Sequence, residues 1–386
     1  MLRECLDSLL AQTRQLDQII VVDDGSTDDT QETLHAYGAK LKVLRQENAG
    51  KAAALNNAIA HSDSDYVWIC DDDDIAEIDA CAALAGALDA KAEASFSYGR
   101  FRRFRDVQGI REVLPMSYWP DRHEETFFLE LLERCFVCQF SSMVRRVVYS
   151  DVGPFDEALL RSEDYDMILR IARRHHGTYV DMSLFLQRIH AGTRGARGDR
   201  FSANQSATKW LAYDRVFLDR MRRELALGEL TPPFARSMST DQRQRAALLQ
   251  RACIAGRHAM WEECLADLEE ASALAPTVQA STDEQAIVKR TLSEPDAVPA
   301  LIENSALVRQ FQAFLTRSEF GRSIADAFAD PLFWQIQACI TALQPAACWS
   351  RLRSLVAFVG APRVIRHGSI LALRRLVPGR PRPKQR

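Results

Sequence analysis

The stretch Tyr66-Val67-Trp68-Ile69-Cys70-Asp71-Asp72-Asp73-Asp74 places four carboxylates directly after an apolar run. An uninterrupted apolar run of this length is typical of a strand that is buried on both faces of a sheet. Adjacent carboxylates repel one another, so the cluster lowers stability unless a cation or a phosphate-bound metal ion lies among them. A solvated acidic turn is the alternative interpretation. This strand end is the first candidate for a functional site.

A second acidic strand end lies earlier in the chain. The apolar strand Gln18-Ile19-Ile20-Val21-Val22 runs into Asp23 and Asp24, then Gly25, which suits a turn, and Ser26 or Thr27, which can cap a helix. Ligands of α/β sheets bind at the carboxyl ends of the strands, which is where both acidic clusters fall.

Strand and helix signals alternate through the first half of the chain, which predicts a largely parallel sheet with helices on both faces. Helical spacing is expected over 2–11, 28–37, 77–92 and 163–174 and after Gly50, and strands over 18–22, 41–44, 66–70, 94–104, 139–144 and 178–189. The stretch from Arg100 to Arg122 has weak periodicity and is expected to be a loop over the site.

Beyond about Phe201 the strand signals vanish, and Ala, Leu, Arg and Glu dominate. This change predicts an all-α region. Its helices are expected over 204–226, 240–255, 260–273, 284–292, 299–314 and 318–329.

Composition limits the classes of function. Proteins that bind nucleic acid with their whole surface are strongly basic. The net charge of -3 therefore argues against a nucleic-acid partner. Nine scattered cysteines are typical of reduced thiols in a cytoplasmic protein rather than of a disulfide framework. No run of 18 uninterrupted apolar residues occurs, so a spanning helix is not expected.

The C-terminal end of the chain is strongly basic. No acidic residue follows Asp330, and ten Lys or Arg lie between Arg351 and Arg386 with apolar residues among them. A basic amphipathic segment of this kind suits an anionic membrane surface, which would place the protein at the inner face of the plasma membrane. A helix packed on the protein, followed by a disordered tail from Pro378, is the alternative.

Six motifs in the same order resemble those of family 2 of the glycosyltransferases, which has the GT-A fold. They span Leu2 to His190, and their joint occurrence is specific although each motif alone is weak. The motifs are Asp23-Asp24-Gly25-Ser26-Thr27-Asp28, Asn48-Ala49-Gly50-Lys51 with Asn56, Asp71-Asp72-Asp73, Val152-Gly153-Pro154-Phe155-Asp156-Glu157, Glu163-Asp164-Tyr165-Asp166 with Arg170, and Gln187-Arg188-Ile189-His190.

The resemblance implies an α/β protein with a GT-A, Rossmann-like, mostly parallel sheet, followed by an all-α C-terminal region. The expected parts are a glycosyltransferase domain over 1–200, a helical domain over 201–350 and a basic amphipathic segment and tail over 351–386. The expected activity is transfer of a hexose-type sugar, with inversion, from a nucleotide-diphosphate sugar, a uridine one first, to a glycan or lipid-linked acceptor in polysaccharide synthesis.

The resemblance also implies roles for individual residues. Asp164, with Glu163 beside it, is expected to act as the general base. The donor is expected to bind at Asp23, Asp24, Asn56, Asp71 and Arg188. A divalent cation, Mg²⁺ or Mn²⁺, is expected at Asp71, Asp73 and His190.

The chain departs from the family at its start, where members carry an additional opening strand in the centre of the sheet. Loss of a central strand would leave two neighbours with unpaired backbone groups. The resemblance therefore suggests that Met1 is an internal methionine, which translation of the DNA ahead of it tests. Two other functions stay open: an inactive, truncated relic whose helical half binds a partner, and a nucleotidyltransferase, which would release pyrophosphate.

Overall fold

The computed structural model describes residues 1–116, 119–120, 124–189 and 206–341, with single residues and short pieces up to 364. These residues form two compact units. The first comprises Met1–Leu131 with Cys135–Phe217, and the second comprises Leu132–Arg134 with the chain from Leu218 onward. The predicted His190 site residue and most of the basic segment 351–386 lie outside the described residues.

The first unit contains two sheets. One is a parallel pair in which Val22 of the first strand lies opposite Leu44 of the second. The other has six strands in the order β3-β7-β5-β8-β4, with β6 paired to β5. The strands are β1 (Ile20–Asp24), β2 (Lys42–Gln46), β3 (Tyr66–Trp68), β4 (Ile75–Ala76), β5 (Phe96–Val107), β6 (Ile110–Val113), β7 (Ser142–Arg145) and β8 (Gly177–Arg188).

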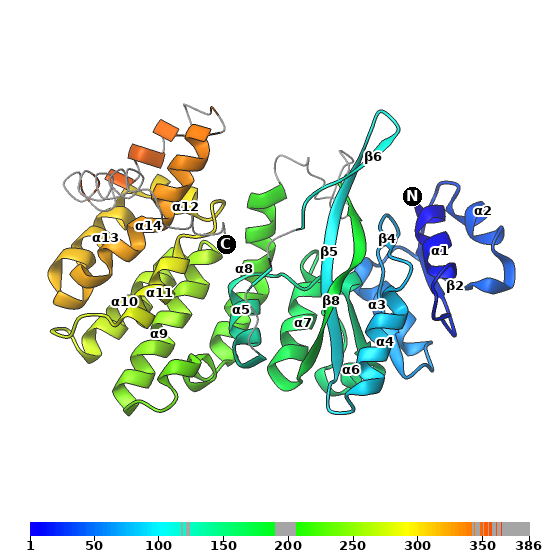
Figure 1. Ribbon diagram of the computed structural model, residues 1–386, viewed down its shortest axis with the longest axis horizontal. Coiled ribbons are helices and arrows are strands. Elements are labelled where there is room, and N and C mark those ends of the chain that lie inside the picture. Colours follow the sequence, from blue (N-terminus) through cyan, green and yellow to red (C-terminus); the bar gives the residue numbers. More distant parts are fainter. Residues whose placement is uncertain are drawn as a thin grey trace, which may run out of the picture. The chain divides into compact units, whose positions relative to one another are not determined.

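The strand directions bring several carboxyl ends to one edge of the larger sheet. β5 and β8 are parallel and lie side by side (Figure 1), and β7 is antiparallel to both β3 and β5. Consequently β3, β5 and β8 all run the same way. The α/β class is confirmed, but the larger sheet is mixed rather than mostly parallel, because β7, β4 and β6 run opposite to β3, β5 and β8.

The prediction of a loop from Arg100 to Arg122 is wrong for the first part of this stretch. β5 continues to Val107 and turns through Gln108 and Gly109, both with positive φ, into β6. Such a two-residue turn matches the twist of a hairpin. The strand was missed because its outer half is Arg-rich and exposed, so its alternation of apolar and polar residues is weak.

Helices supply the apolar faces that cover the sheets. Leu84 and Leu88 of α4 are fully buried against Met143 and Leu184 of the sheet. The helices of this part of the chain are α1 (Leu2–Leu10), α2 (Thr30–His35), α3 (Lys51–Ala60), α4 (Ala80–Ala90), α5 (Phe127–Glu133), α6 (Arg146–Val152), α7 (Glu163–Arg174) and α8 (Ser206–Glu224).

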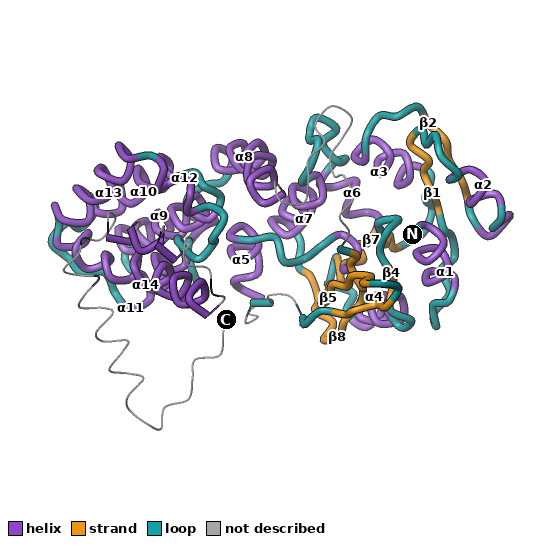
Figure 2. Tube along the Cα trace, turned by 90° about the horizontal axis from the view of Figure 1, so that it is seen from above, coloured by secondary structure: helices purple, strands orange, loops and turns teal. Residues whose placement is uncertain are grey.

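The second unit is helical in its described residues, as predicted, and Figure 2 shows no strand among its helices. Trp261, Phe311 and Phe328 form its aromatic core. No helix in the described part of the chain is both long enough and apolar enough to cross a membrane. The helices are α9 (Thr240–Arg257), α10 (Trp261–Leu274), α11 (Thr282–Thr291), α12 (Val298–Glu303), α13 (Ser305–Arg317) and α14 (Glu319–Thr341).

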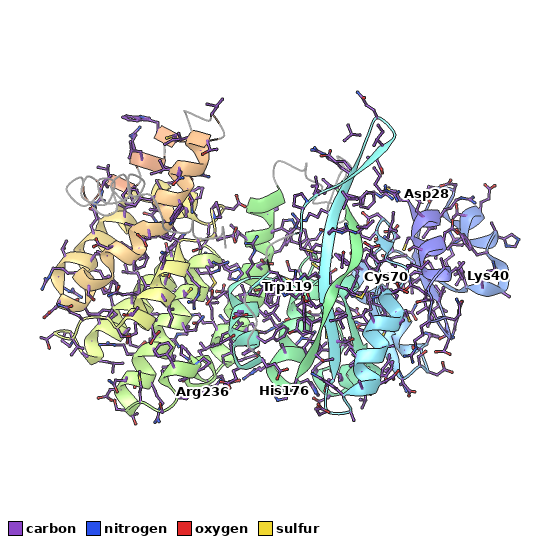
Figure 3. The ribbon with its side chains drawn as sticks, in the orientation of Figure 1. Asp28, Lys40, Cys70, Trp119, His176 and Arg236 are labelled. Atoms are coloured by element: carbon purple, nitrogen blue, oxygen red, sulfur yellow. The ribbon has the colours of Figure 1, made fainter. Side chains whose placement is uncertain are left out.

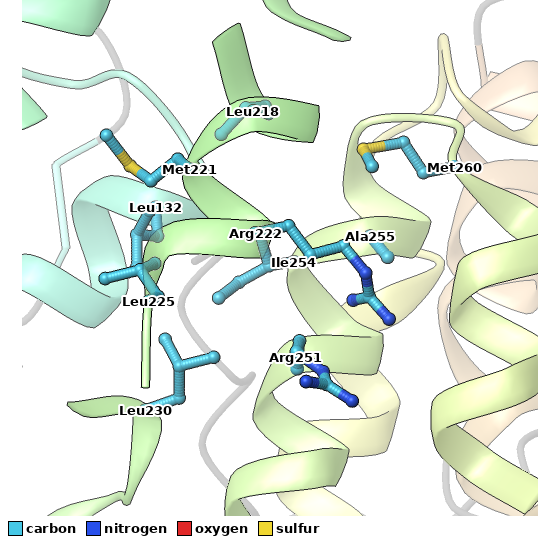
Figure 4. Close-up of a pocket in the computed structure, with 10 residues that line it drawn as sticks. All are labelled: Leu132, Leu218, Met221, Arg222, Leu225, Leu230, Arg251, Ile254, Ala255 and Met260. Atoms are coloured by element: carbon cyan, nitrogen blue, oxygen red, sulfur yellow. The ribbon is translucent and has the colours of Figure 1, made fainter. Parts of the chain in front are cut away.

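A cavity of about 30 Å³ lies within the second unit (Figure 4). Leu218 and Met221 of α8, Ile254 and Ala255 of α9 and Met260 are among the residues that line it. Its two arginines, Arg222 and Arg251, direct their guanidinium groups to Asp267. An apolar cavity of this size suits a packing defect better than a substrate site.

Gly25 fixes how closely the end of β1 approaches the loop that precedes α3. Its φ is +78°, and an added Cβ would lie 2.9 Å from the backbone nitrogen of Asn48. We expect Gly25→Ala to lower the free energy of unfolding by about 2–4 kcal/mol, because left-handed strain and overpacking add together. Urea unfolding followed by circular dichroism measures this change.

Gly38 provides the matched control for this substitution. Its φ is +56°, but an added Cβ would meet nothing within 4 Å. Gly38→Ala should therefore cause the left-handed strain without the overpacking and lower the free energy of unfolding by about 1 kcal/mol. Equal losses in the two variants would contradict the close approach between Gly25 and Asn48.

Candidate functional site

Asp24, at the end of β1, organises the loop that starts α3. Its carboxylate accepts hydrogen bonds from the backbone nitrogens of Ala49 and Gly50, both at 2.8 Å, and from Gln46 Nε2 at 2.9 Å. Gly50 has a φ of +94° and begins the helix without a side-chain cap. This arrangement makes Lys51 the first residue of α3 and fixes its position relative to β1.

Asp23 is engaged within the protein. Its side chain is buried and accepts hydrogen bonds from the Ser26 backbone nitrogen at 2.8 Å and from Gln31, with Arg45 3.7 Å away. Burial by itself raises the pKa of Asp23, but the hydrogen bonds from Ser26 and Gln31 and the charge of Arg45 lower it overall. Asp23 therefore stabilises the turn between β1 and α2.

The four aspartates Asp71–Asp74 form an acidic turn after β3. Lys51 joins this acidic turn to the start of α7. Its Nζ lies 2.7 Å from Asp71 Oδ1 and 3.6 Å from Glu163 Oε1. Burial opposes the charged form, but the carboxylates of Asp71, Asp164 and Glu163 outweigh it and raise the pKa of Lys51 above its usual range. The side chain is 42% exposed, so solvent screens part of this attraction.

Arg188, at the end of β8, holds the other half of the acidic turn, which directly follows Cys70 (Figure 3). Its backbone nitrogen donates to Asp74 Oδ1 at 2.8 Å, and its Nε donates to the Asp73 carbonyl oxygen at 2.9 Å. The guanidinium, 6% exposed, also pairs with Glu4 at 2.6 Å and with Asp106. Arg188 thus shapes the turn with contacts inside the protein.

Asp74 is the buried member of the acidic turn. Burial, together with repulsion from Asp73 and Asp71, raises its pKa to about 8, even though the backbone hydrogen bond from Arg188 lowers it. The Asp74 carboxylate is 2% exposed and already accepts a hydrogen bond from the Arg188 backbone nitrogen. The candidate metal ligands of the turn are therefore the more exposed Asp71 and Asp73.

The start of α7 is strained. Ser162 has a φ of +61°, which is unusual for a residue with a side chain, and its Oγ lies 2.5 Å from Asp214 Oδ1. Strain of this kind gathers at functional sites, where surrounding contacts hold it. Burial, then repulsion from Asp164, raises the pKa of Glu163, while Lys51 lowers it.

Asn56 connects α3 to the segment ahead of α7. Its Nδ2 donates to the Phe155 carbonyl oxygen at 3.0 Å and to Glu157 Oε1 at 2.9 Å, and its Oδ1 accepts from the Phe155 nitrogen. Arg170 donates to the Val152 carbonyl oxygen at 2.9 Å from the other side. In this structure Asn56 positions the Val152–Glu157 motif.

Asp71 and Asp73 have the donor chemistry that a divalent cation needs. Carboxylate oxygens are its preferred ligands, and Mg²⁺ commonly binds one or two carboxylates together with substrate phosphates and water. No group of three His, Cys, Asp or Glu side chains suited to a metal ion occurs in the part of the chain that the structure describes. Two carboxylates supply part of the ligands of such a cation, and phosphate oxygens or water would supply the rest.

The predicted site residues fall into two sets. Asp71, Asp73, Glu163 and Asp164 meet around Lys51 and the acidic turn, whereas Asp23, Asp24, Asn56 and Arg188 are engaged in holding the surrounding loops. Sequence reasoning gave no role to Lys51 or to the Ser162–Asp214 contact. Lys51 lies within a quoted motif and could have been found, but nothing in the sequence links Ser162 to Asp214.

Comparison with known proteins identifies the family. The family model described as "Glycosyl transferase family 2" matches residues 1–153. An uncharacterized glycosyltransferase of Haemophilus influenzae is 36% identical over 214 residues, covering 54% of this chain and 77% of that protein. One from Rickettsia felis is 32% identical over 200 residues, covering 49% of this chain and 32% of that protein.

Solved structures add a more distant similarity. A crystal structure of S. aureus TarS matches with a TM-score of 0.48 at 15% identity, covering 81% of this chain and 52% of that chain. The match to this chain covers only part of its curated relatives. Of the first four, it covers 32% of the length of two and 60% of the length of the other two. The family match and the Haemophilus relative establish that the chain belongs to family 2 of the glycosyltransferases.

Proposed function

We propose that this chain transfers a sugar from a nucleotide-diphosphate sugar to an acceptor hydroxyl, with inversion, in the synthesis of a glycan or cell-surface polysaccharide. The observation that carries the proposal is Lys51, whose ammonium bridges Asp71 after β3 and Glu163 at the start of α7. It brings a candidate metal-binding turn and a candidate general base to one place. A uridine nucleotide is the first donor to test, and a lipid-linked glycan is the first acceptor.

Asp164 is the proposed general base. It lies in the first turn of α7, where the positive end of the helix dipole favours an ionised carboxylate. The acceptor hydroxyl gives its proton to Asp164 while its oxygen forms the bond to the anomeric carbon. The bond from that carbon to the phosphate oxygen breaks, and its electron pair leaves with the nucleoside diphosphate. Attack from the face opposite the leaving group inverts the anomeric centre.

Asp71 and Asp73 would hold a divalent cation, Mg²⁺ or Mn²⁺, against the diphosphate. When bound, such an ion neutralises the negative charge that the leaving group gains. Asp24 and Asp23 support the site by fixing the loop before Lys51 and the turn after β1. Arg188 supports it by holding the turn that carries Asp73.

We expect Asp73→Asn and Asp164→Asn each to lower the rate of sugar transfer by at least about a hundredfold. The first removes a metal ligand, and the second removes the acceptor of the proton. Release of nucleoside diphosphate from a panel of uridine-activated sugars, with Mn²⁺ and then with excess chelator, measures the rate. Chelation should abolish transfer by the wild type.

Asp63→Asn is the control, because Asp63 is an exposed aspartate away from both acidic clusters in the sequence. It should retain wild-type activity. Release of pyrophosphate instead of nucleoside diphosphate would indicate a nucleotidyltransferase. Full activity of Asp164→Asn would disprove the role of Asp164 as general base.

We further propose that the protein works at the cytoplasmic face of a membrane, on an anionic lipid surface. The ten basic residues between Arg351 and Arg386 support this, as do the exposed side chains of Trp334, at 47%, and Trp349, at 63%. Tryptophan is enriched at membrane interfaces, and each basic residue near an anionic surface contributes about 1 kcal/mol.

Replacing four basic residues with glutamine should therefore weaken binding to phosphatidylglycerol vesicles by roughly two to three orders of magnitude. Vesicle sedimentation in low and high salt measures the binding, which salt should also weaken. Equal binding of the wild type to neutral phosphatidylcholine vesicles would contradict the proposal. The test set is Arg351, Arg353, Arg363 and Arg366, and the control set, whose members are exposed, is Arg236, Arg243, Arg309 and Arg317.

A further inference from the structure

Lys51 differs from the other cation of the acidic turn in how firmly it is held. Arg188 is 6% exposed and donates to three separate acceptors besides its backbone bond to Asp74. Lys51 is 42% exposed and makes one close contact, 2.7 Å to Asp71, with Glu163 at 3.6 Å as the next carboxylate. An ammonium on a flexible stem can exchange between two such partners, whereas a buried guanidinium that is bonded on several sides cannot.

The partner that Lys51 bonds is also a proposed metal ligand. Asp71 Oδ1 accepts the ammonium at 2.7 Å, so the cation of Lys51 already neutralises this carboxylate. A divalent ion that bound the same carboxylate oxygen would lie within a few ångströms of the ammonium. Two positive charges at that distance repel each other strongly in a partly enclosed site.

We infer that Lys51 neutralises Asp71 before the donor arrives and that binding of the metal and donor displaces its ammonium toward Glu163 and Asp164. This inference deepens the proposed function and rests on it. Lys51 is a positioning residue: its ammonium restrains the acidic turn in the free protein. After displacement, the ammonium faces the start of α7 and lowers the repulsion between Glu163 and Asp164 while the acceptor is bound.

The backbone around Lys51 suits this exchange. The N-terminus of α3 is fixed by Asp24 through Ala49 and Gly50, so the Cα of Lys51 is held and only its side chain has to move. The carboxylate of Glu163 is already within 3.6 Å, so a rotation about the side-chain bonds of Lys51 completes the change of partner.

Mn²⁺ binding by the free protein tests this inference. Electron paramagnetic resonance of free Mn²⁺, recorded with and without UDP, gives the affinity without relying on activity. Lys51→Met should raise the Mn²⁺ affinity of the free protein at least about fivefold, because it removes a competing charge from Asp71. It should also lower kcat for transfer, because the start of α7 then loses the charge of Lys51.

Three variants make the result specific. Lys51→Arg keeps the charge and should bind Mn²⁺ as the wild type does. Lys40→Met removes an exposed lysine at the periphery of the first unit and should change nothing (Figure 3). Lys51→Gln replaces Lys51→Met if the latter does not fold, with the same expected increase.

Unchanged or weaker Mn²⁺ binding in both Lys51→Met and Lys51→Gln would overturn the inference. Asp73→Asn separates that failure from a failure of the proposed function. If the wild type binds Mn²⁺, Asp73→Asn loses it and Lys51→Met leaves it unchanged, only the role of Lys51 is disproved. If the wild type binds no Mn²⁺ even with UDP, the metal-dependent function fails and the role of Lys51 fails with it.

Discussion

Carboxylates gathered at one edge of a sheet must be neutralised, and much of the first unit is built around this requirement. Lys51 neutralises Asp71 and faces Glu163, while Arg188 donates to the Asp73 carbonyl oxygen from Nε and to the Asp74 carboxylate from its backbone nitrogen. Without the charge of Lys51 and the hydrogen bonds from Arg188, repulsion within the acidic turn would lower the stability of the fold. The same concentration of negative charge is the proposed binding site of a divalent cation.

The directions of the strands in the larger sheet make this arrangement possible. β3 and β8 run the same way, so the acidic turn after β3 and Arg188 at the end of β8 meet at one edge. Loops that come from elsewhere are then tied to the same edge by single polar side chains. Asp24 fixes the loop before Lys51, and Asn56 fixes the segment ahead of α7. The site thus depends on a few hydrogen bonds between distant motifs.

Much of this could be predicted from the sequence, because its signals are local. The apolar run ending in Asp71 to Asp74 predicted a strand followed by the acidic turn, and the loss of strand signals after Phe201 predicted the helical unit. The expected burial of that strand on both faces is wrong, because β3 is half-buried and lies at the end of the strand order. The β5–β6 hairpin was missed because exposed arginines mask its alternation. The antiparallel course of β7 could not be predicted, because a four-residue strand carries no signal of its direction.

Side-chain partners between distant segments were the least predictable part of the site. Asp23, Asp24 and Asn56 carry the residue types of a ligand site, yet their hydrogen bonds run to Gln31, Gly50 and Phe155. Asparagine and aspartate use the same oxygen and nitrogen atoms to hydrogen-bond a loop or to bind a ligand. The residue type alone therefore does not distinguish a structural role from ligand binding. The Ser162–Asp214 contact joins residues 52 positions apart and has no sequence signature.

The central claim is that an acidic turn, neutralised by Lys51 in the free protein, takes up a divalent cation together with a nucleoside diphosphate. Anomalous diffraction from crystals grown with Mn²⁺ and UDP tests it most directly. The account predicts a manganese peak at about 2.0–2.2 Å from a carboxylate oxygen of Asp73 or Asp71, with the ammonium of Lys51 moved away from Asp71. A UDP-bound crystal whose manganese lies elsewhere, or in which Lys51 still pairs with Asp71 beside the metal, would contradict it.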